Sequence, residues 1–185
     1  MHRSKFIIAL VAVAVQVGIA HAQNTYYVDA SCGDDAWAGI DSDCVAPDGP
    51  KATIQAAIDD AVAGDSVVLA PGTYVGPGNR DLNFQGKPIV VRSEQPNNVG
   101  VVHATVIDCQ GSASDPHRAF LFVSGEQGTS VVDGLTMING YAPLENVGGG
   151  TYSVGGAILC TNASSPTIRR CILRSNYALG DEPVI

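Results

Sequence analysis

Asp115 and His117, which stand on either side of Pro116, have side chains that can move a proton. An imidazole next to a carboxylate can act as a general base near neutral pH, because histidine changes its charge in that range. The pair Asp-Pro is also a common turn signal, so a structural turn is the competing interpretation. The sequence favours the turn and leaves proton transfer open.

The second group that can do chemistry is basic and comprises Arg169, Arg170 and Arg174. A guanidinium can stabilise negative charge that develops during a reaction, and Arg170 is the candidate for this role. Successive side chains of a strand point to opposite faces, so Arg169 and Arg170 are expected on different surfaces unless a bend separates them. Solvated strand charges are the interpretation that the sequence favours.

Acidic residues crowd the segment from residue 23 to residue 52, which we treat as a separate N-terminal part. The candidate metal ligands in this segment are Asp34, Asp35, Asp41 and Asp43. Hard oxygen ligands are what Ca²⁺ binds, but the spacing is not that of an EF-hand loop. Aspartates also form turns with their own backbone, which is the favoured interpretation. Ca²⁺ is the one cofactor that the sequence leaves open.

Five cysteines are present, and Cys32 and Cys44 lie together in the acidic segment. We predict that these two close a short loop as a disulfide in an oxidising compartment. The odd total leaves at least one thiol free or paired between chains. Cys109, Cys160 and Cys171 lie in or beside apolar runs, where small buried residues are expected.

Residues 1–22 have the features of a secretory signal peptide. Arg3 and Lys5 precede an apolar run, and Ala20-His21-Ala22 is a small-x-small cleavage site. The mature chain is therefore expected outside the cytoplasm or at the cell surface, without a transmembrane helix. Removing two of the 10 basic residues leaves 8 against 18 acidic ones, a net charge of −10. This charge disfavours nucleic acid and anionic membranes as partners.

One amphipathic helix is predicted over residues 53–62. Thr53 suits the N-cap, Gly64 suits the position after the last turn, and apolar residues recur at helical spacing between them. The helix directly precedes the first apolar run. It is therefore expected to cap the N-terminal end of the fold.

Short apolar runs recur along the remaining chain, each of strand length and bounded by Gly, Pro, Asn or Ser. Equivalent runs are expected to stack in three sets, so that Val132 lies beside Ile168 and Met137 beside Leu173. The first set comprises residues 67–69, 89–91, 120–122 and 157–159; the second 82–84, 106–108, 131–133 and 167–169; the third 135–138 and 171–174.

The succession of these motifs resembles the right-handed parallel β-helix of the pectin-lyase-like superfamily. Gly155-Gly156-Ala157-Ile158, followed by Leu173-Arg174-Ser175-Asn176, is similar to the GGAI and FxxN repeats of polymorphic outer membrane proteins, with Leu in place of Phe. The resemblance implies an all-β solenoid over residues 53–185, opened by the capping helix. Because no capping element follows the last run, this solenoid is expected to be a fragment, truncated at its C-terminal end, or to pair there with another chain.

The same resemblance sets the expected function. Asp115-Pro116-His117 is similar to a short motif of the alginate C5-epimerases, in which His and Asp take part in proton transfer. However, the superfold hosts adhesins as well as lyases, hydrolases and epimerases. We expect a secreted or cell-surface repeat protein of structural, adhesive or carbohydrate-binding role, without catalysis in this segment. The alternative is a polysaccharide lyase or uronate C5-epimerase, and the expected partners are a polysaccharide, another surface protein or a second copy.

Overall fold

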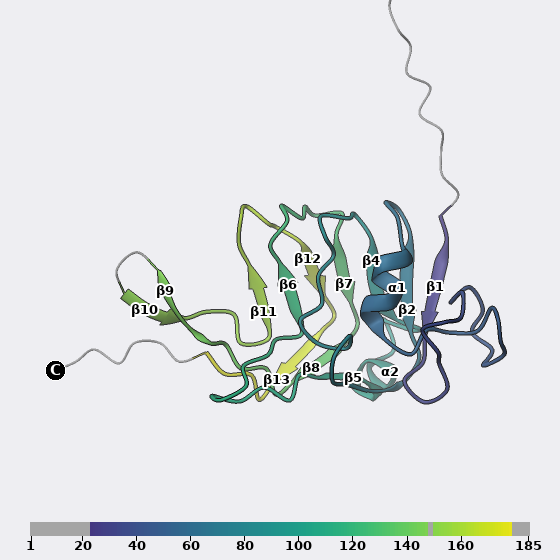
Figure 1. Ribbon diagram of the computed structural model, residues 1–185, viewed down its shortest axis with the longest axis horizontal. Helices are drawn as coiled ribbons and strands as arrows, with labels where there is room; N and C mark the ends of the chain where they lie inside the picture. Colours follow the sequence, from purple (N-terminus) through teal and green to yellow (C-terminus); the bar gives the residue numbers. More distant parts are fainter. Residues whose placement is uncertain (1–22, 148–149, 179–185) are drawn as a thin grey trace, which may run out of the picture.

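Short strands with two short helices make up the computed structural model, which describes residues 23–147 and 150–178 (Figure 1). The signal peptide assigned to residues 1–22 lies outside the described residues. The elements are β1 (Thr25–Val28), α1 (Ile54–Asp60), β2 (Ser66–Leu69), β3 (Gly72–Val75), β4 (Val90–Ser93), α2 (Val99–Ala104), β5 (Thr105–Asp108), β6 (Phe120–Phe122), β7 (Val131–Asp133), β8 (Thr136–Ile138), β9 (Leu144–Val147), β10 (Gly150–Ser153), β11 (Ile158–Cys160), β12 (Thr167–Arg169) and β13 (Ile172–Arg174).

Three of the sheets are parallel. The largest has the order β1-β2-β4-β7-β12, a second has the order β13-β8-β5-β3, and β6 pairs with β11. An isolated parallel bridge joins Leu82 to Phe120, which extends the third sheet toward the N-terminus. Strands β9 and β10 form an antiparallel hairpin apart from the parallel sheets.

The expectation of an all-β, right-handed parallel β-helix with a single capping helix is wrong. The described residues form several separate parallel sheets of short strands together with two helices, an α/β-type arrangement, and no solenoid was found among them. The unexpected helix α2 lies against β5 and β8. Asn98 caps it by accepting a hydrogen bond from the Gly100 backbone N–H at 3.0 Å. The pattern of short apolar runs did not predict this helix.

The expected sets of runs are partly correct, since the run at 67–69 pairs with the run at 89–91 and the run at 120–122 pairs with the run at 157–159. Val132 lies beside Ile168 and Met137 beside Leu173, as predicted. In contrast, β4 pairs with β7 and β5 with β8, so the runs near residues 90 and 106 each belong to a different set from the one expected. Loops of unequal length separate the early strands, so a constant sequence step does not identify their partners.

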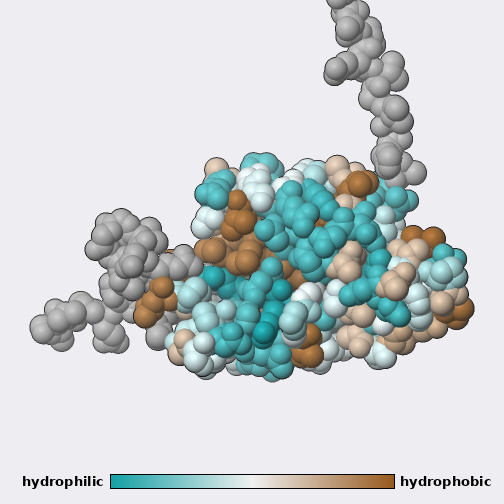
Figure 2. Space-filling view, in the orientation of Figure 1, coloured by the Kyte–Doolittle hydropathy of each residue, from teal (hydrophilic) through white to brown (hydrophobic). Residues whose placement is uncertain are grey.

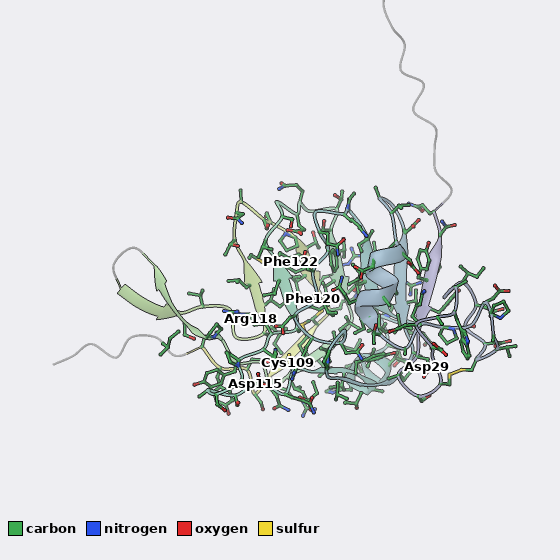
Figure 3. All side chains as sticks on the ribbon, viewed as in Figure 1. Asp29, Cys109, Asp115, Arg118, Phe120 and Phe122 are labelled. Carbon is green, nitrogen blue, oxygen red and sulfur yellow. A yellow bond between two sulfur atoms is a disulfide. The ribbon has the colours of Figure 1, made fainter. Side chains whose placement is uncertain are left out.

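Between the sheets lies one hydrophobic core. Phe84, Phe120 and Phe122 are fully buried, and Phe84 meets the other two rings edge-on at 6.0 and 5.0 Å. In Figure 3, Phe120 and Phe122 point into the body of the molecule. Val91 and Val132 pair in register on neighbouring strands, and both side chains are fully buried in this core.

Helix α1 forms within the segment for which the sequence predicts a helix, and it lies against β1 and β2. Thr53 Oγ1 accepts from the Ala56 N–H at 3.3 Å, and the side chain of Asn79 accepts from the Ile54 N–H at 3.0 Å. These two acceptors satisfy amide groups that the first helical turn leaves unpaired. The helix ends at Asp60, slightly earlier than the sequence pattern predicts.

No helix within residues 23–147 and 150–178 is both long and apolar enough to cross a membrane.

Candidate functional site

Asp133 is a buried carboxylate that holds two arginine side chains. It is the last residue of β7 and only 1% exposed. Its carboxylate accepts hydrogen bonds from Arg169 Nε at 2.9 Å and from Arg170 Nε at 2.7 Å. Arg170 Nη2 also donates to the same carboxylate, so Arg170 binds it as a fork. One negative charge therefore orients two positive ones and leaves a local surplus of positive charge.

The two arginines share one surface because the backbone bends between them. Arg170 has a φ of 53°, the left-handed conformation, directly after β12 ends at Arg169. This bend reverses the alternation that an extended strand would impose. Arg170 therefore turns back to the carboxylate that Arg169 binds. The sequence placed the two side chains on different faces unless a bend separates them, and this bend is that exception.

Arg92 extends this group along the largest sheet. It pairs in register with Asp133, which in turn pairs with Arg169. Residues paired in this way point to the same face of a sheet from strands about 4.8 Å apart. Arg92 Nη1 donates to the backbone oxygens of Ser93 and Glu94 at 3.0 Å, which fixes its head group near its own strand. We call Arg92, Arg169 and Arg170 the arginine cluster. Arg174 lies on a different sheet, beside Ile138.

A groove of about 290 Å³ opens next to Arg170. We call it the Arg170 groove; it is lined by Pro96, Asn97, Val99, Val102, Arg170 and Ile172. Helix α2 supplies the two valines, and β13 supplies the isoleucine. The hydrogen bond with Asp133 raises the pKa of the Arg170 guanidinium, so a fixed positive charge stands at the edge of an apolar surface.

His117 lies between two carboxylates. Its Nδ1 is 2.5 Å from Asp81 Oδ2, and its Nε2 is 3.1 Å from Asp115 Oδ1. Asp81 also accepts a hydrogen bond from the Arg118 backbone N–H at 2.8 Å. Asp81 was not among the residues expected to do chemistry. It approaches His117 because Leu82 bridges to Phe120, which sets the two preceding segments side by side.

The arrangement around His117 is that of a structural contact rather than of an exposed base. Solvent does not reach Nε2, and no described residue forms a well-aligned hydrogen bond with it. A general base must reach the proton that it removes, and Asp115 stands over this nitrogen. The cluster therefore joins the turn at Asp81 to the loop at residues 115–118. Figure 3 labels Asp115 and Arg118, the first and last residues of this loop.

Three of the four acidic candidates for Ca²⁺, namely Asp34, Asp35 and Asp41, accept hydrogen bonds in turns or at the start of α1. Asp34 Oδ1 accepts from the Ala36 N–H at 2.9 Å, and Asp41 Oδ1 accepts from the Asp43 N–H at 3.0 Å. Asp35 accepts from both the backbone N–H and the hydroxyl of Thr53, and so supports the start of α1. In the described part of the chain, the one tight group of metal-ligand types comprises Asp29, Cys32 and Cys44.

Those two cysteines form the predicted disulfide, so their sulfur atoms are not free to bind a metal ion. Cys109, Cys160 and Cys171 are free thiols, and Cys109 is fully buried. Burial raises the pKa of the Cys109 thiol to about 12. Cys160 is exposed and Cys171 is half-buried, so the expectation that all three are buried is correct for Cys109 alone.

No known protein family matches the chain, and neither does any curated protein or solved structure. The resemblance carried by the GGAI and FxxN motifs therefore stays a prediction from those residues.

Proposed function

We propose that the protein is secreted or displayed at a cell surface and binds an acidic polysaccharide through the arginine cluster. The observation that carries this proposal is the pair of guanidinium groups held by the buried Asp133. The proposal concerns binding, because the best-placed base, His117, has its second ring nitrogen shielded from solvent.

Charge distribution supports an anionic ligand at this position. The chain without residues 1–22 has 18 acidic and 8 basic residues, so most of its surface repels an acidic polymer. Two of those basic residues, Arg169 and Arg170, bind one carboxylate, and Arg92 pairs in register with that carboxylate's residue, Asp133. Their charge exceeds that of Asp133, so the cluster attracts an anion where its surroundings do not.

The geometry of the cluster suits carboxylate or sulfate groups. A guanidinium presents its N–H donors in a planar fork that matches such groups in a bidentate manner. Arg169 and Arg170 lose little freedom on binding because Asp133 already orients them. Arg92 lies on β4, two strands from Arg169 and therefore about 10 Å away along the sheet, so separate charged units of a linear polymer can meet separate arginines.

The test is binding to immobilised acidic and neutral polysaccharides, with polygalacturonate and dextran as the two probes. We expect binding to polygalacturonate only, weakened about tenfold when Arg92→Gln and Arg169→Gln are combined. Added salt should weaken wild-type binding more steeply than binding of this variant. The matched control is Arg174→Gln, which removes an exposed positive charge from another sheet and should leave affinity unchanged.

Two results would refute the proposal. One is equal affinity for dextran and polygalacturonate, since no charge would then be recognised. The other is an equal loss in Arg174→Gln and in the cluster variant, since binding would then depend on net charge rather than on this site.

A further inference from the structure

We propose that the Arg170 groove binds a small organic carboxylate with an aliphatic body. This site does not rest on polysaccharide binding, because its walls are apolar and only Arg170 is shared with the arginine cluster.

The apolar walls of the groove indicate a ligand with an aliphatic body. Pro96, Val99, Val102 and Ile172 present hydrocarbon to the groove, and none of the described lining residues is aromatic. Sugars commonly bind against aromatic faces and rows of hydrogen-bonding groups, which this groove does not offer. Val99 is 68% exposed, so apolar surface remains for a ligand to cover.

The charge indicates the head group. Asp133 takes the Nε–H and one Nη2–H of Arg170, so three of the five guanidinium N–H donors have no acceptor among the described residues. Arg169 and Arg170 together exceed Asp133 by one positive charge, which a monoanion neutralises. A planar carboxylate fits the guanidinium fork better than an alcohol or an amide does.

The groove is built by firm contacts, so it exists before a ligand arrives. Gly134 has a φ of 67°, and a Cβ atom on it would lie 2.5 Å from Pro96 Cα, so this wall is packed against the turn that follows Asp133. Thr136 Oγ1 donates to the Val102 carbonyl at 2.7 Å and fixes α2 on β8. A preformed site loses less freedom on binding than a mobile one.

The volume limits the size of the ligand. About 290 Å³ is near the small end of the range for ligand pockets. If each non-hydrogen atom takes the ~30 Å³ of a water molecule, the groove holds on the order of ten such atoms. Cyclohexanecarboxylate is therefore a suitable probe.

The experiment is titration of the full chain with cyclohexanecarboxylate, in which amide chemical shifts locate the binding site and calorimetry measures the affinity. Two matched compounds separate the contributions of the groove, namely cyclohexylmethanol, which lacks the charge, and acetate, which lacks the body. We expect the largest shifts around Val99, Val102 and Ile172, and affinity at least about tenfold weaker for either matched compound.

Variants then assign the binding to this groove. Val99→Ser and Arg170→Gln should each weaken cyclohexanecarboxylate binding about tenfold. The matched control Val75→Ser, at an exposed valine of β3, should not weaken it. Val99 is exposed, so its variant keeps the fold and decides the question even if Arg170→Gln were to unfold.

The outcomes separate this site from the polysaccharide site. Val99→Ser should leave polygalacturonate binding intact, and Arg92→Gln should leave cyclohexanecarboxylate binding intact. Equal affinity for the acid and the alcohol, no binding at millimolar concentration, or shifts confined to another part of the chain would each overturn the proposal.

Discussion

The first and last strands of the parallel sheets differ in how they are covered. At the N-terminal end, α1 lies on β1 and β2, and its Ile54 and Ile58 are fully buried. At the other end, β11, β12 and β13 are the last strands of their sheets. Their inward residues Ile158 and Ile168 pack against the core but stay partly exposed. Strands of similar length and composition thus differ in burial according to what lies on top of them.

Polar contacts reinforce the N-terminal closure. Lys51 is largely buried and its Nζ lies 2.6 Å from Asp60 Oδ2, which joins the acidic segment to the end of α1. Asp65 accepts from the backbone N–H groups of Asn24 and Val62. Buried polar groups with partners of this kind specify one arrangement, so this end is held by more than hydrophobic burial.

At the opposite end, the last strand of each parallel sheet is less buried than the strand beside it. All three residues of β7 are buried, whereas no residue of the neighbouring β12 is. Figure 2 shows hydrophobic residues gathered on the left of the view, over the region of β6 and β11 in Figure 1. Side chains of the same types are therefore less buried in these last strands, and matched substitutions at the two ends measure the difference.

The largest expected difference is between Ile58→Ala and Ile168→Ala. Truncation at fully buried Ile58 should lower the free energy of unfolding by about 2–5 kcal/mol, since it removes buried methyl groups and leaves a cavity. Ile168 is partly exposed, so its truncation should cost about 1 kcal/mol. Urea denaturation of both variants measures this, and equal losses would contradict the difference between the ends.

The disulfide of the acidic segment should have the next largest effect. Cys32 and Cys44 are separated by 12 positions, and cross-linking a loop of about this size stabilises a fold by roughly 3 kcal/mol. Replacing both by Ser should therefore lower the unfolding midpoint in urea. Cys160→Ser is the control, because it removes an exposed free thiol and should change stability by less than about 0.5 kcal/mol. A midpoint unchanged by loss of the disulfide would mean that the acidic segment contributes little to this end.

Part of this contrast could be predicted from the sequence. Local signals sufficed for α1, whose cap and apolar stripe lie within one short segment, and for the disulfide in its short loop. The repeat at a step of 36 also placed β12 on β7 correctly. These features depend on residues close in sequence or on a step that two successive layers share.

The remainder could not be predicted because it depends on long-range placement. Arg170 has no glycine-like signal for its positive φ, so the sequence left open whether a bend separates it from Arg169. Asp81 lies 36 positions from His117 and is close to it only because Leu82 meets Phe120. Had Leu82 been assigned to the set of Phe120, the carboxylate beside His117 would have been found.

Glu126 provides a smaller, pH-dependent test, since it joins turns from both halves of the chain. It is buried, and its carboxylate accepts from the Gly86 and Ser124 backbone N–H groups and from the Ser164 hydroxyl. Burial alone would raise the pKa of Glu126, but these hydrogen bonds lower it below the ordinary 4.5. The stabilisation is therefore full above that ordinary value and is lost as the pH falls through the lower folded value.

Glu126→Gln should accordingly lower the free energy of unfolding by about 1–3 kcal/mol at neutral pH. The gap to the wild type should narrow as the pH falls below 4.5 and through the lower folded pKa of Glu126, because protonation then removes the charge. Urea denaturation at several pH values measures it, with the exposed Glu94→Gln as the matched charge control. A gap that stays constant with pH would show that shape, and not the charge, is what Glu126 contributes.

The smallest expected difference concerns the caps of the two helices. Thr53 Oγ1 accepts from the Ala56 N–H and binds Asp35, so it ties α1 to the acidic segment. Asn98 caps α2, which lies against β5 and β8. Loss of a cap costs about 0.5–2 kcal/mol, and we expect Thr53→Ala near the upper limit and Asn98→Ala near the lower one.

Amide hydrogen exchange shows which segments each substitution destabilises. Thr53→Ala should expose amides of α1, β1 and β2 together, whereas Asn98→Ala should expose those of α2 alone. If Thr53→Ala released only α1, the acidic segment and the helix would be independent covers, and the closure of this end would not be cooperative.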